Sequence, residues 1–109
     1  MDVTPLPALT EHLLQEARTD TARRAARTVC GGRDHTLRQT LISLLAGAEL
    51  SEHENPGEAT LQVLVGRVRV DWQGGSAELE AGDHSELPQQ RHSVAALQDS
   101  VLLLTAANL

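Results

Sequence analysis

The sequence of 109 residues contains no lysine, no tyrosine and no phenylalanine, and these absences exclude several kinds of chemistry. Without lysine there is neither a Schiff-base nucleophile nor the lysine of a phosphate-binding loop, and without tyrosine there is no phenolic acid. The single tryptophan, Trp72, cannot supply the aromatic platforms on which single-stranded nucleic acids stack. Since the formal net charge is −6, we expect no binding to nucleic acid.

Cysteine is also scarce, and long apolar runs are missing. The one cysteine, Cys30, cannot form an internal disulfide or a four-thiolate zinc site, which indicates a reducing compartment. The longest apolar stretches, such as Val101 to Leu104, are far shorter than the roughly 18 residues that suggest a membrane span. Met1 to Val3 do not open a secretory signal. We therefore expect a cytoplasmic protein that does not enter a membrane.

The length of the chain is sufficient for one compact domain and too short for two. A domain of this size buries only about two-thirds of the surface that its unfolded chain exposes. Association of two copies would cover additional apolar surface. We therefore expect a homodimer.

The N-terminal segment has the pattern of an amphipathic helix. Helix-initiating residues at 4–7 precede apolar side chains spaced by three and four, which form one stripe: Leu6, Leu9, Leu13 and Ala17. This spacing predicts a short helix over residues 7–18. Residues 22–27 fit either a continuation of the helix or an extended segment. We interpret the nearby arginines as a solvated face and not as an anion site: Arg18, Arg23, Arg24 and Arg27.

From residue 28 onward, short β-rich runs alternate with turn residues. The predicted runs cover residues 36–46, 59–65, 67–72, 77–80, 85–87, 92–97 and 101–106. Strands without intervening helices cannot pair in parallel through helical crossovers, so they should form an antiparallel sandwich or barrel. The sequence thus predicts an all-β fold with an N-terminal helical arm, divided into an arm at 1–27 and a barrel at 28–109.

Alternation along these runs assigns side chains to the two faces of each strand. One face of the run 67–72 is apolar and the other is charged, which is typical of a half-buried antiparallel strand. The same parity predicts an inward-facing set consisting of Val68, Val70, Trp72, Ala59, Leu61, Val63, Val65, His92, Val94 and Ala96. His92 would therefore be a polar group on an otherwise apolar face.

The five histidines are the main chemical resource of the chain. His12, His35 and His84 are expected on the surface, because they lie on the arm helix, after a glycine-rich turn and on an outward position. His53 opens a turn-rich stretch, but the sequence around it lacks the second histidine of a zincin motif and the paired thiols of a zinc deaminase. His53 and His92 remain as the candidate site residues.

Two segments around these histidines resemble the motifs of the cupin family. Residues 47–66, GAELSEHENPGEATLQVLVG, resemble the first motif, and residues 82–94, GDHSELPQQRHSV, resemble the second. With the strands around them, the resemblance covers roughly residues 28–107. It implies a double-stranded β-helix, the cupin jelly-roll barrel, which is often dimeric and has a pocket in its mouth.

The resemblance also implies a metal site of three histidines and one glutamate, of which this chain keeps half. His53 and His92 match, whereas Asn55 replaces the second histidine and Ala59 replaces the glutamate. An amide oxygen is a poor donor for a first-row transition metal, so no cofactor is expected to be tightly bound. Glu58 is the one carboxylate near the motif that could join His53 and His92 to hold a divalent transition metal.

Three functions are compatible with these residues. The favoured one is a non-catalytic binding module whose pocket, with His53, Asn55 and His92, suits an anionic or carbonyl-bearing metabolite. The alternative is a metal-dependent cupin enzyme, an oxygenase or isomerase, that uses His53, His92 and possibly Glu58. The third is a structural role with the pocket filled by side chains.

Overall fold

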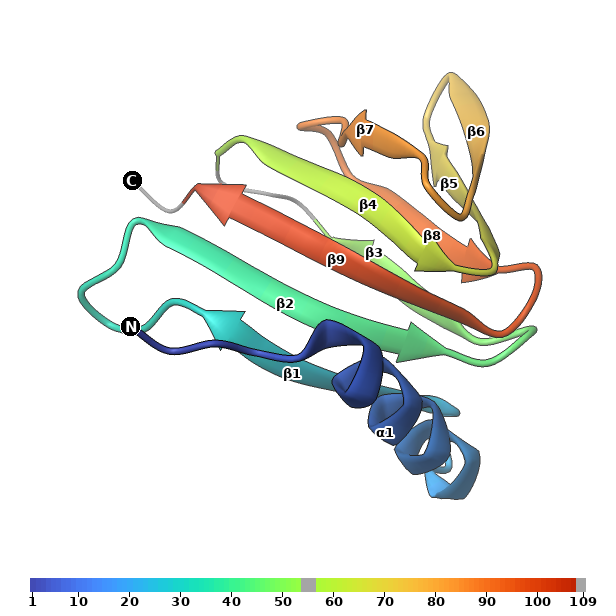
Figure 1. Ribbon diagram of the computed structural model, residues 1–109. Helices are drawn as coiled ribbons and strands as arrows, with labels where there is room; N and C mark the ends of the chain where they lie inside the picture. The colour runs from blue at the N-terminus through green and yellow to red at the C-terminus, as the bar shows by residue number, and fades with distance from the viewer. Residues whose placement is uncertain (54–56, 108–109) are drawn as a thin grey trace.

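The structure is a computed structural model that describes residues 1–53 and 57–107, with the backbone alone for residues 52 and 53. One helix is followed by nine strands in this part of the chain (Figure 1). Their bounds are α1 (Leu6–Thr19), β1 (Arg24–Cys30), β2 (Leu37–Leu44), β3 (Glu49–His53), β4 (Ala59–Val65), β5 (Arg67–Trp72), β6 (Gly75–Glu80), β7 (His84–Glu86), β8 (His92–Ala96) and β9 (Ser100–Ala107).

The strands form two sheets that face each other, and neighbouring strands within each sheet are antiparallel. The first sheet has the order β1-β2-β9-β4-β7, and the second has the order β3-β8-β5-β6. Strands β6 and β7 follow each other in the chain but form edges of different sheets. This arrangement confirms the predicted antiparallel jelly-roll architecture with an N-terminal helix.

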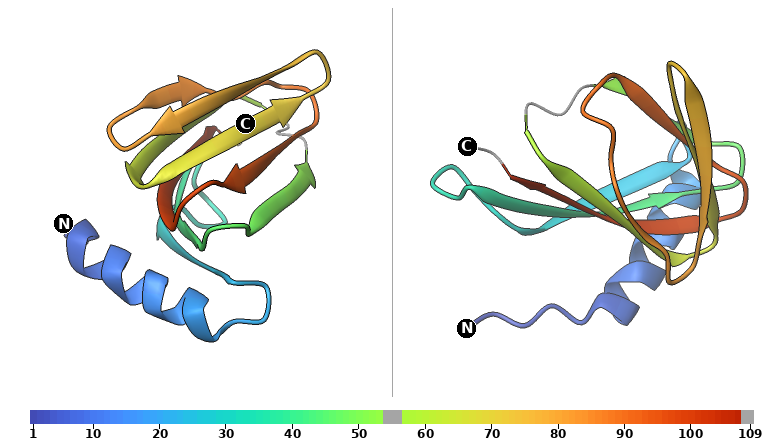
Figure 2. Two further views of the ribbon diagram at one scale, coloured as in Figure 1. Left: turned by 90° about the vertical axis from the view of Figure 1, so that its right-hand side faces the viewer. Right: turned by 90° about the horizontal axis from the view of Figure 1, so that it is seen from above.

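Helix α1 lies outside the barrel, against the outer face of the first sheet (Figures 1 and 2). Its buried residues are Thr10, Leu13 and Ala17, of which the last two belong to the predicted stripe. Leu13 packs with Leu41 and Val101 of the sheet. The buried Ser43 hydroxyl lies 2.8 Å from the carbonyl oxygen of Leu13 and donates a hydrogen bond to it. The helix predicted over residues 7–18 is confirmed, with bounds one residue wider at each end.

The segment that the pattern left open is extended. Strand β1 begins at Arg24 and pairs with β2, so the position between residues 27 and 28 lies within a strand of the first sheet. Three arginines of this region form contacts within the protein. Arg23 donates a hydrogen bond to the carbonyl of Ala46 and Arg24 donates one to that of Glu49, while Arg27 pairs with the Glu16 carboxylate at 3.3 Å.

The barrel interior contains the apolar core that alternation predicted. Strands β4 and β5 have the predicted bounds, and the buried members of the core include Leu61, Val63, Val68, Val70 and Val94. Strand β1 was not assigned from the sequence, and β3 lay within the first cupin-like motif without being assigned as a strand. Both are edge strands, β1 in the first sheet and β3 in the second.

The inward position predicted for Val65 is wrong. Its side chain is 37% exposed, because the pairing of β4 with β9 shifts register between Val63 and Val65. Such an irregularity reverses the alternation for the residues beyond it. As a result Leu64 packs with the residues under α1, and Val65 faces outward at the end of the strand.

Candidate functional site

Three strands of the second sheet bring the candidate residues into one row. The Cα atom of His92, at the start of β8, is paired with that of His53 on β3 and with that of Trp72 on β5. Trp72 is in turn paired with Gly75 on the edge strand β6. Directly opposed residues in antiparallel strands share a face of the sheet. We call this end of the barrel, where β5 ends and β8 begins, the Trp72 end.

The pairing of β3 with β8 is irregular, and the irregularity determines which residue lies across from His92. Glu49 and Leu50 oppose Ala95 and Val94 in regular order, which would bring residue 52 opposite His92. A register shift places the backbone of His53 there instead. The two histidines that the cupin resemblance selects are therefore cross-strand neighbours in the backbone.

His92 is fully buried, with an exposed fraction of 0%. Its Nδ1 lies 3.0 Å from the carbonyl oxygen of Gln90. Because a carbonyl oxygen only accepts hydrogen bonds, Nδ1 carries a proton in this contact. In the neutral ring, Nε2 is then the nitrogen that has the lone pair. The β7–β8 connection thereby fixes both the ring and its tautomer.

Trp72 is held against the backbone of the β5–β6 hairpin. A Cβ atom added to Gly75 would lie 3.0 Å from Cζ2, 3.2 Å from Cε2 and 3.4 Å from Nε1 of the indole. The ring thus occupies the space that a side chain on Gly75 would need. An aromatic ring that covers a glycine on the neighbouring strand is a known way of protecting the edge of a sheet.

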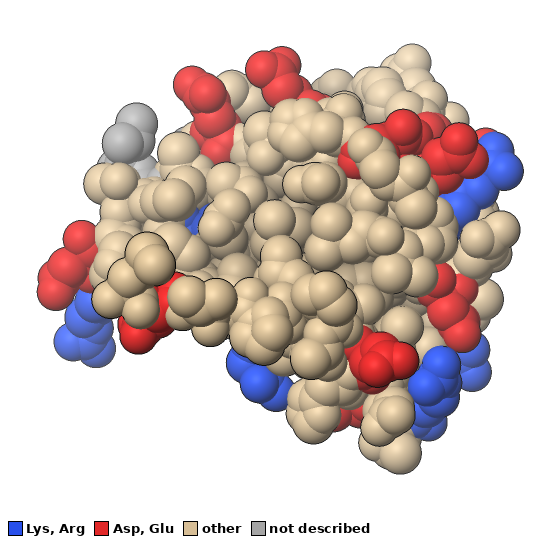
Figure 3. Space-filling model, in the orientation of Figure 1, with Lys and Arg blue, Asp and Glu red and all other residues tan. Residues whose placement is uncertain are grey.

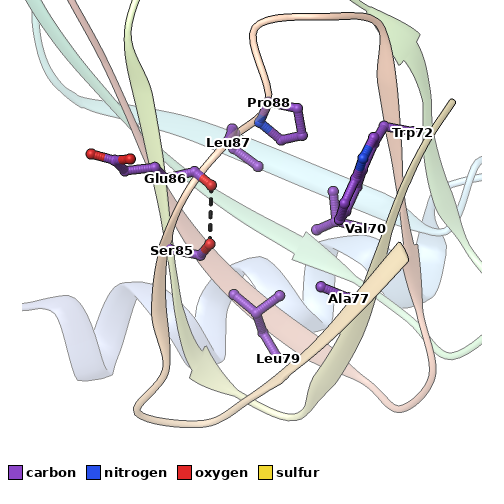
Figure 4. A pocket seen from close by; sticks show the side chains of 8 residues that line it. All are labelled: Val70, Trp72, Ala77, Leu79, Ser85, Glu86, Leu87 and Pro88. Atoms are coloured by element: carbon purple, nitrogen blue, oxygen red, sulfur yellow. Dashed lines mark hydrogen bonds between the residues drawn. The ribbon is translucent and has the colours of Figure 1, made fainter. Parts of the chain in front are cut away.

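A cavity lies beside this ring, between the edge strands β6 and β7 (Figure 4). Its volume is about 340 Å³, which is within the range of roughly 300–1,000 Å³ for small-molecule sites. The lining is mostly apolar and consists of Val70, Trp72, Ala77, Leu79, Ser85, Glu86, Leu87 and Pro88. The Ser85 hydroxyl lies 3.0 Å from the carbonyl oxygen of Glu86 and donates to it.

The sequence predicted a pocket around His53, Asn55 and His92, and the cavity lies next to His92 along the second sheet. It shares Trp72, the cross-strand partner of His92, but His92 is not part of its lining. Asn55 lies outside the described residues, and for His53 the description covers the backbone. Ligand binding by these three residues stays a prediction.

The residues expected outside the site are exposed. His12 pairs with Glu16 at 2.8 Å on the surface of α1, and His35 and His84 are also exposed. Ser85 is half-buried and Leu87 is buried, whereas Glu86 is exposed like His84, so the two faces of this short run alternate. Figure 4 shows the Glu86 carboxylate pointing away from the cavity.

The positions of the cupin metal motif lack part of the side chains that a metal would need. Ala59 is 6% exposed and belongs to the barrel core, so a methyl group occupies the position of the motif's glutamate. Glu58 is exposed, one position before it, and its backbone carbonyl accepts a hydrogen bond from Ala107. The described residues contain no group of three histidine, cysteine or carboxylate side chains placed to hold a metal. A site of three histidines and one glutamate does not fit this chain.

The alternation of β5 predicted that Trp72 faces inward, but not that it forms a cavity wall. One feature of the sequence could have indicated this role of Trp72: the inward-facing tryptophan is followed closely by Gly74 and Gly75, which have no side chains. The contribution of the residues that follow β7 could not be predicted in this way. Leu87 and Pro88 face Trp72 across the gap between two sheets, and no short-range pattern specifies that distance.

A second apolar hollow, of about 730 Å³, lies outside the barrel between α1 and β4. It is lined by Leu6, Pro7, Ala8, Thr10, Glu11, Leu64 and Val65. Charged side chains are found mainly around the rim of this face of the molecule, and its centre is largely uncharged (Figure 3). This hollow contains no histidine and is separated from His92 by the first sheet.

Known structures were compared with this architecture. A RmlC-like cupin protein from Desulfovibrio desulfuricans is similar over 99% of this chain and 97% of its own, with a TM-score of 0.76 and 24% identity. SPY1581 from Streptococcus pyogenes, a protein of unknown function, is similar over 83% of this chain and 78% of its own, with a TM-score of 0.72 and 23% identity.

A salicylate 1,2-dioxygenase from Pseudaminobacter salicylatoxidans is also similar, over 92% of this chain but 33% of its own, with a TM-score of 0.76 and 23% identity. No family model matches the sequence, and no curated protein matches it. The two facing antiparallel sheets define a jelly-roll protein. More specifically, the chain has the RmlC-like cupin fold, as its two motifs indicated.

In the described part of the chain, α1 is the one α-helix, and it is neither long enough nor apolar enough to cross a bilayer.

Proposed function

We propose that this protein is a small-molecule binding module whose ligand occupies the cavity beside Trp72. The observation that supports the proposal is the cavity itself, about 340 Å³ in volume and walled by apolar side chains on two sheets. Clefts of this size and composition are the usual form of small-molecule sites. A structural role with a filled interior would not require such a space. The predicted homodimer is also part of the proposal, whereas ligand binding by His53, Asn55 and His92 is a separate prediction, because His92 does not line this cavity.

The protein contains its own reporter for a binding experiment. Trp72 is the single tryptophan, and there is no tyrosine, so the intrinsic fluorescence comes from a ring that lines the cavity. We expect small neutral fragments to shift or quench this emission in a saturable way. A set of such fragments, titrated at constant ionic strength, would provide a first ligand and its dissociation constant.

A substitution that fills the cavity tests whether the signal comes from this site. Ala77 is exposed on the edge strand β6 and lines the cavity, so Ala77→Leu should add bulk there and weaken binding by about tenfold or more. Ser76→Leu adds a similar side chain at the preceding residue, which alternation places on the opposite face of β6. Equal binding by both variants and the unaltered protein would contradict the proposal.

The alternative function is a metal-dependent cupin enzyme that uses His53, His92 and Glu58. It is favoured by one observation, the cross-strand pairing of the backbones of His53 and His92. Elemental analysis of untagged protein separates the two functions. Stoichiometric metal that is lost in both His53→Ala and His92→Ala would favour the enzyme. Metal-free protein that still binds fragments would favour the binding module.

A further inference from the structure

The cavity has one flat wall, formed by the indole of Trp72. The ring is fixed from behind, because three of its atoms lie within 3.4 Å of the place where a Cβ atom on Gly75 would be. In Figure 4 the indole is seen edge-on, with one face turned toward Leu87 and Pro88 across the cavity. A fixed aromatic face opposite apolar side chains forms a slot, and a slot favours a flat molecule over a puckered one.

The charges around the slot indicate what kind of flat molecule enters it. Among the described residues that line the cavity, no side chain is cationic, and the one charged residue, Glu86, is exposed and points away from the cavity. An anionic group would therefore lose its hydration without gaining a positive partner, close to a carboxylate of the same sign. The sequence had favoured an anionic or carbonyl-bearing ligand, whereas this lining favours an uncharged one.

One polar atom in the lining can orient the ligand. The hydroxyl of Ser85 donates its hydrogen to the carbonyl of Glu86, which leaves the oxygen as an acceptor. A hydroxyl or amine hydrogen on the ligand is its natural partner.

We propose that the cavity is selective for a flat, uncharged ring that stacks on Trp72 and carries a hydrogen-bond donor for Ser85. This inference rests on the proposed binding function and defines its ligand class. It assigns Trp72 as the specificity-determining residue and Gly75 as the positioning residue, since Gly75 leaves room for the indole to lie against the hairpin.

Three probes of similar size separate ring shape from charge: benzyl alcohol, cyclohexylmethanol and benzoate. Binding is measured by chemical-shift changes of backbone amides in the full chain, so that the readout does not depend on the tryptophan. We expect benzyl alcohol to bind about fivefold more tightly than cyclohexylmethanol, which has the same hydroxyl on a puckered ring. Benzoate should bind more weakly than benzyl alcohol.

Two variants then test the assigned roles. Trp72→Leu keeps an apolar wall but removes the aromatic face, so the preference for benzyl alcohol should disappear while cyclohexylmethanol still binds. Gly75→Ala should displace the indole toward the cavity, weaken both alcohols and change the emission of Trp72 in the free protein. Ser76→Ala, at the next residue of β6, is the matched control and should behave like the unaltered chain. Dispersed amide spectra establish that each variant is folded.

The outcomes distinguish this inference from the proposed function. Equal binding of the two alcohols, or a preference that survives in Trp72→Leu, would overturn the inference and leave the binding function standing. Tighter binding of benzoate would also overturn it. Failure of all three probes to shift residues of the cavity would count against both. If Trp72→Leu does not fold, the Gly75→Ala variant decides, and unchanged binding there would overturn the role of Gly75.

Discussion

The two ends of the barrel are built from the same strands but differ in how their connections are tied. We call the end opposite to Trp72, where β4 turns into β5, the Gly66 end. There the connections bind one another: Ser100 Oγ accepts from the Arg67 amide at 3.0 Å, and Asp99 accepts from the Ala46 amide at 2.9 Å. The Trp72 end carries the cavity beside the tryptophan and the glycines of the β5–β6 hairpin, and its described connections contact neighbouring strands through the backbone, as in the bond from the Leu87 amide to the Ala59 carbonyl at 2.9 Å. In the proposed function the Trp72 end holds the ligand, while the side-chain contacts of the Gly66 end stabilise the fold.

The largest expected effect is at Gly66. Its φ of +85° is unfavourable for other residues, and an added Cβ atom would overlap the carbonyl of Asp99 and the hydroxyl of Ser100. Gly66→Ala should therefore lower the free energy of unfolding by roughly 3 kcal/mol or more, measured by urea denaturation.

Gly74 provides the matched substitution at the Trp72 end. It has a similar φ of +106°, but an added Cβ atom would meet nothing within 4 Å. Gly74→Ala should cost about 1 kcal/mol, the backbone contribution alone. Equal losses for the two alanine variants would break the comparison between the ends.

An intermediate effect is expected at Ser100, which is fully buried. Its hydroxyl accepts a hydrogen bond from the Arg67 amide and lies 2.7 Å from the carbonyl of Gln98 and 3.1 Å from that of Arg67. Ser100→Ala removes the acceptor of the Arg67 amide and the hydroxyl donor, although the Arg67 carbonyl keeps the Leu97 amide at 2.9 Å, and it should lower the free energy of unfolding by about 1–3 kcal/mol. Hydrogen exchange of the Arg67 amide should also become faster. Exchange at an unchanged rate would show that this contact does not protect the Gly66 end.

The smallest effect on stability is expected for Ala77→Leu at the Trp72 end. Ala77 is exposed on an edge strand, so the free energy of unfolding should change by less than about 0.5 kcal/mol, although fragment binding should be weakened. Thermal unfolding in parallel with the fluorescence titration measures both quantities. A large loss of stability would show that the two ends do not divide structure and binding as the comparison suggests.

Much of the fold could be predicted from the sequence because its signals are local. The alternation of β4 and β5 and the glycines after them fixed both strands and the faces of Val68, Val70 and Trp72. Strand β1 was not predicted because its Arg- and Ala-rich sequence has no clear periodicity. The inward position of Val65 was predicted wrongly because the alternation of residue types does not reveal a register shift.

The candidate site was less predictable, because it depends on pairs from distant segments. The inward position of His92 could be predicted from the alternation along its strand. Its hydrogen bond to the carbonyl of Gln90 could not, because it depends on how the β7–β8 connection folds. The cavity depends on the separation of β6 and β7, which belong to different sheets. Spacing rules describe one strand at a time and do not specify such a separation.

The hydroxyl of Ser43 has a consequence for how the chain could be shortened. It donates to Leu13 of the helix and is also within 3.3 Å of the carbonyl of Ala25 on β1, so a single side chain joins the arm to two strands. A fragment that starts at residue 28 would expose Leu41 and Val101 to water and lose half of an edge strand. Aggregation of that fragment is the expected result, since an uncovered apolar sheet with an interrupted edge invites pairing with other chains.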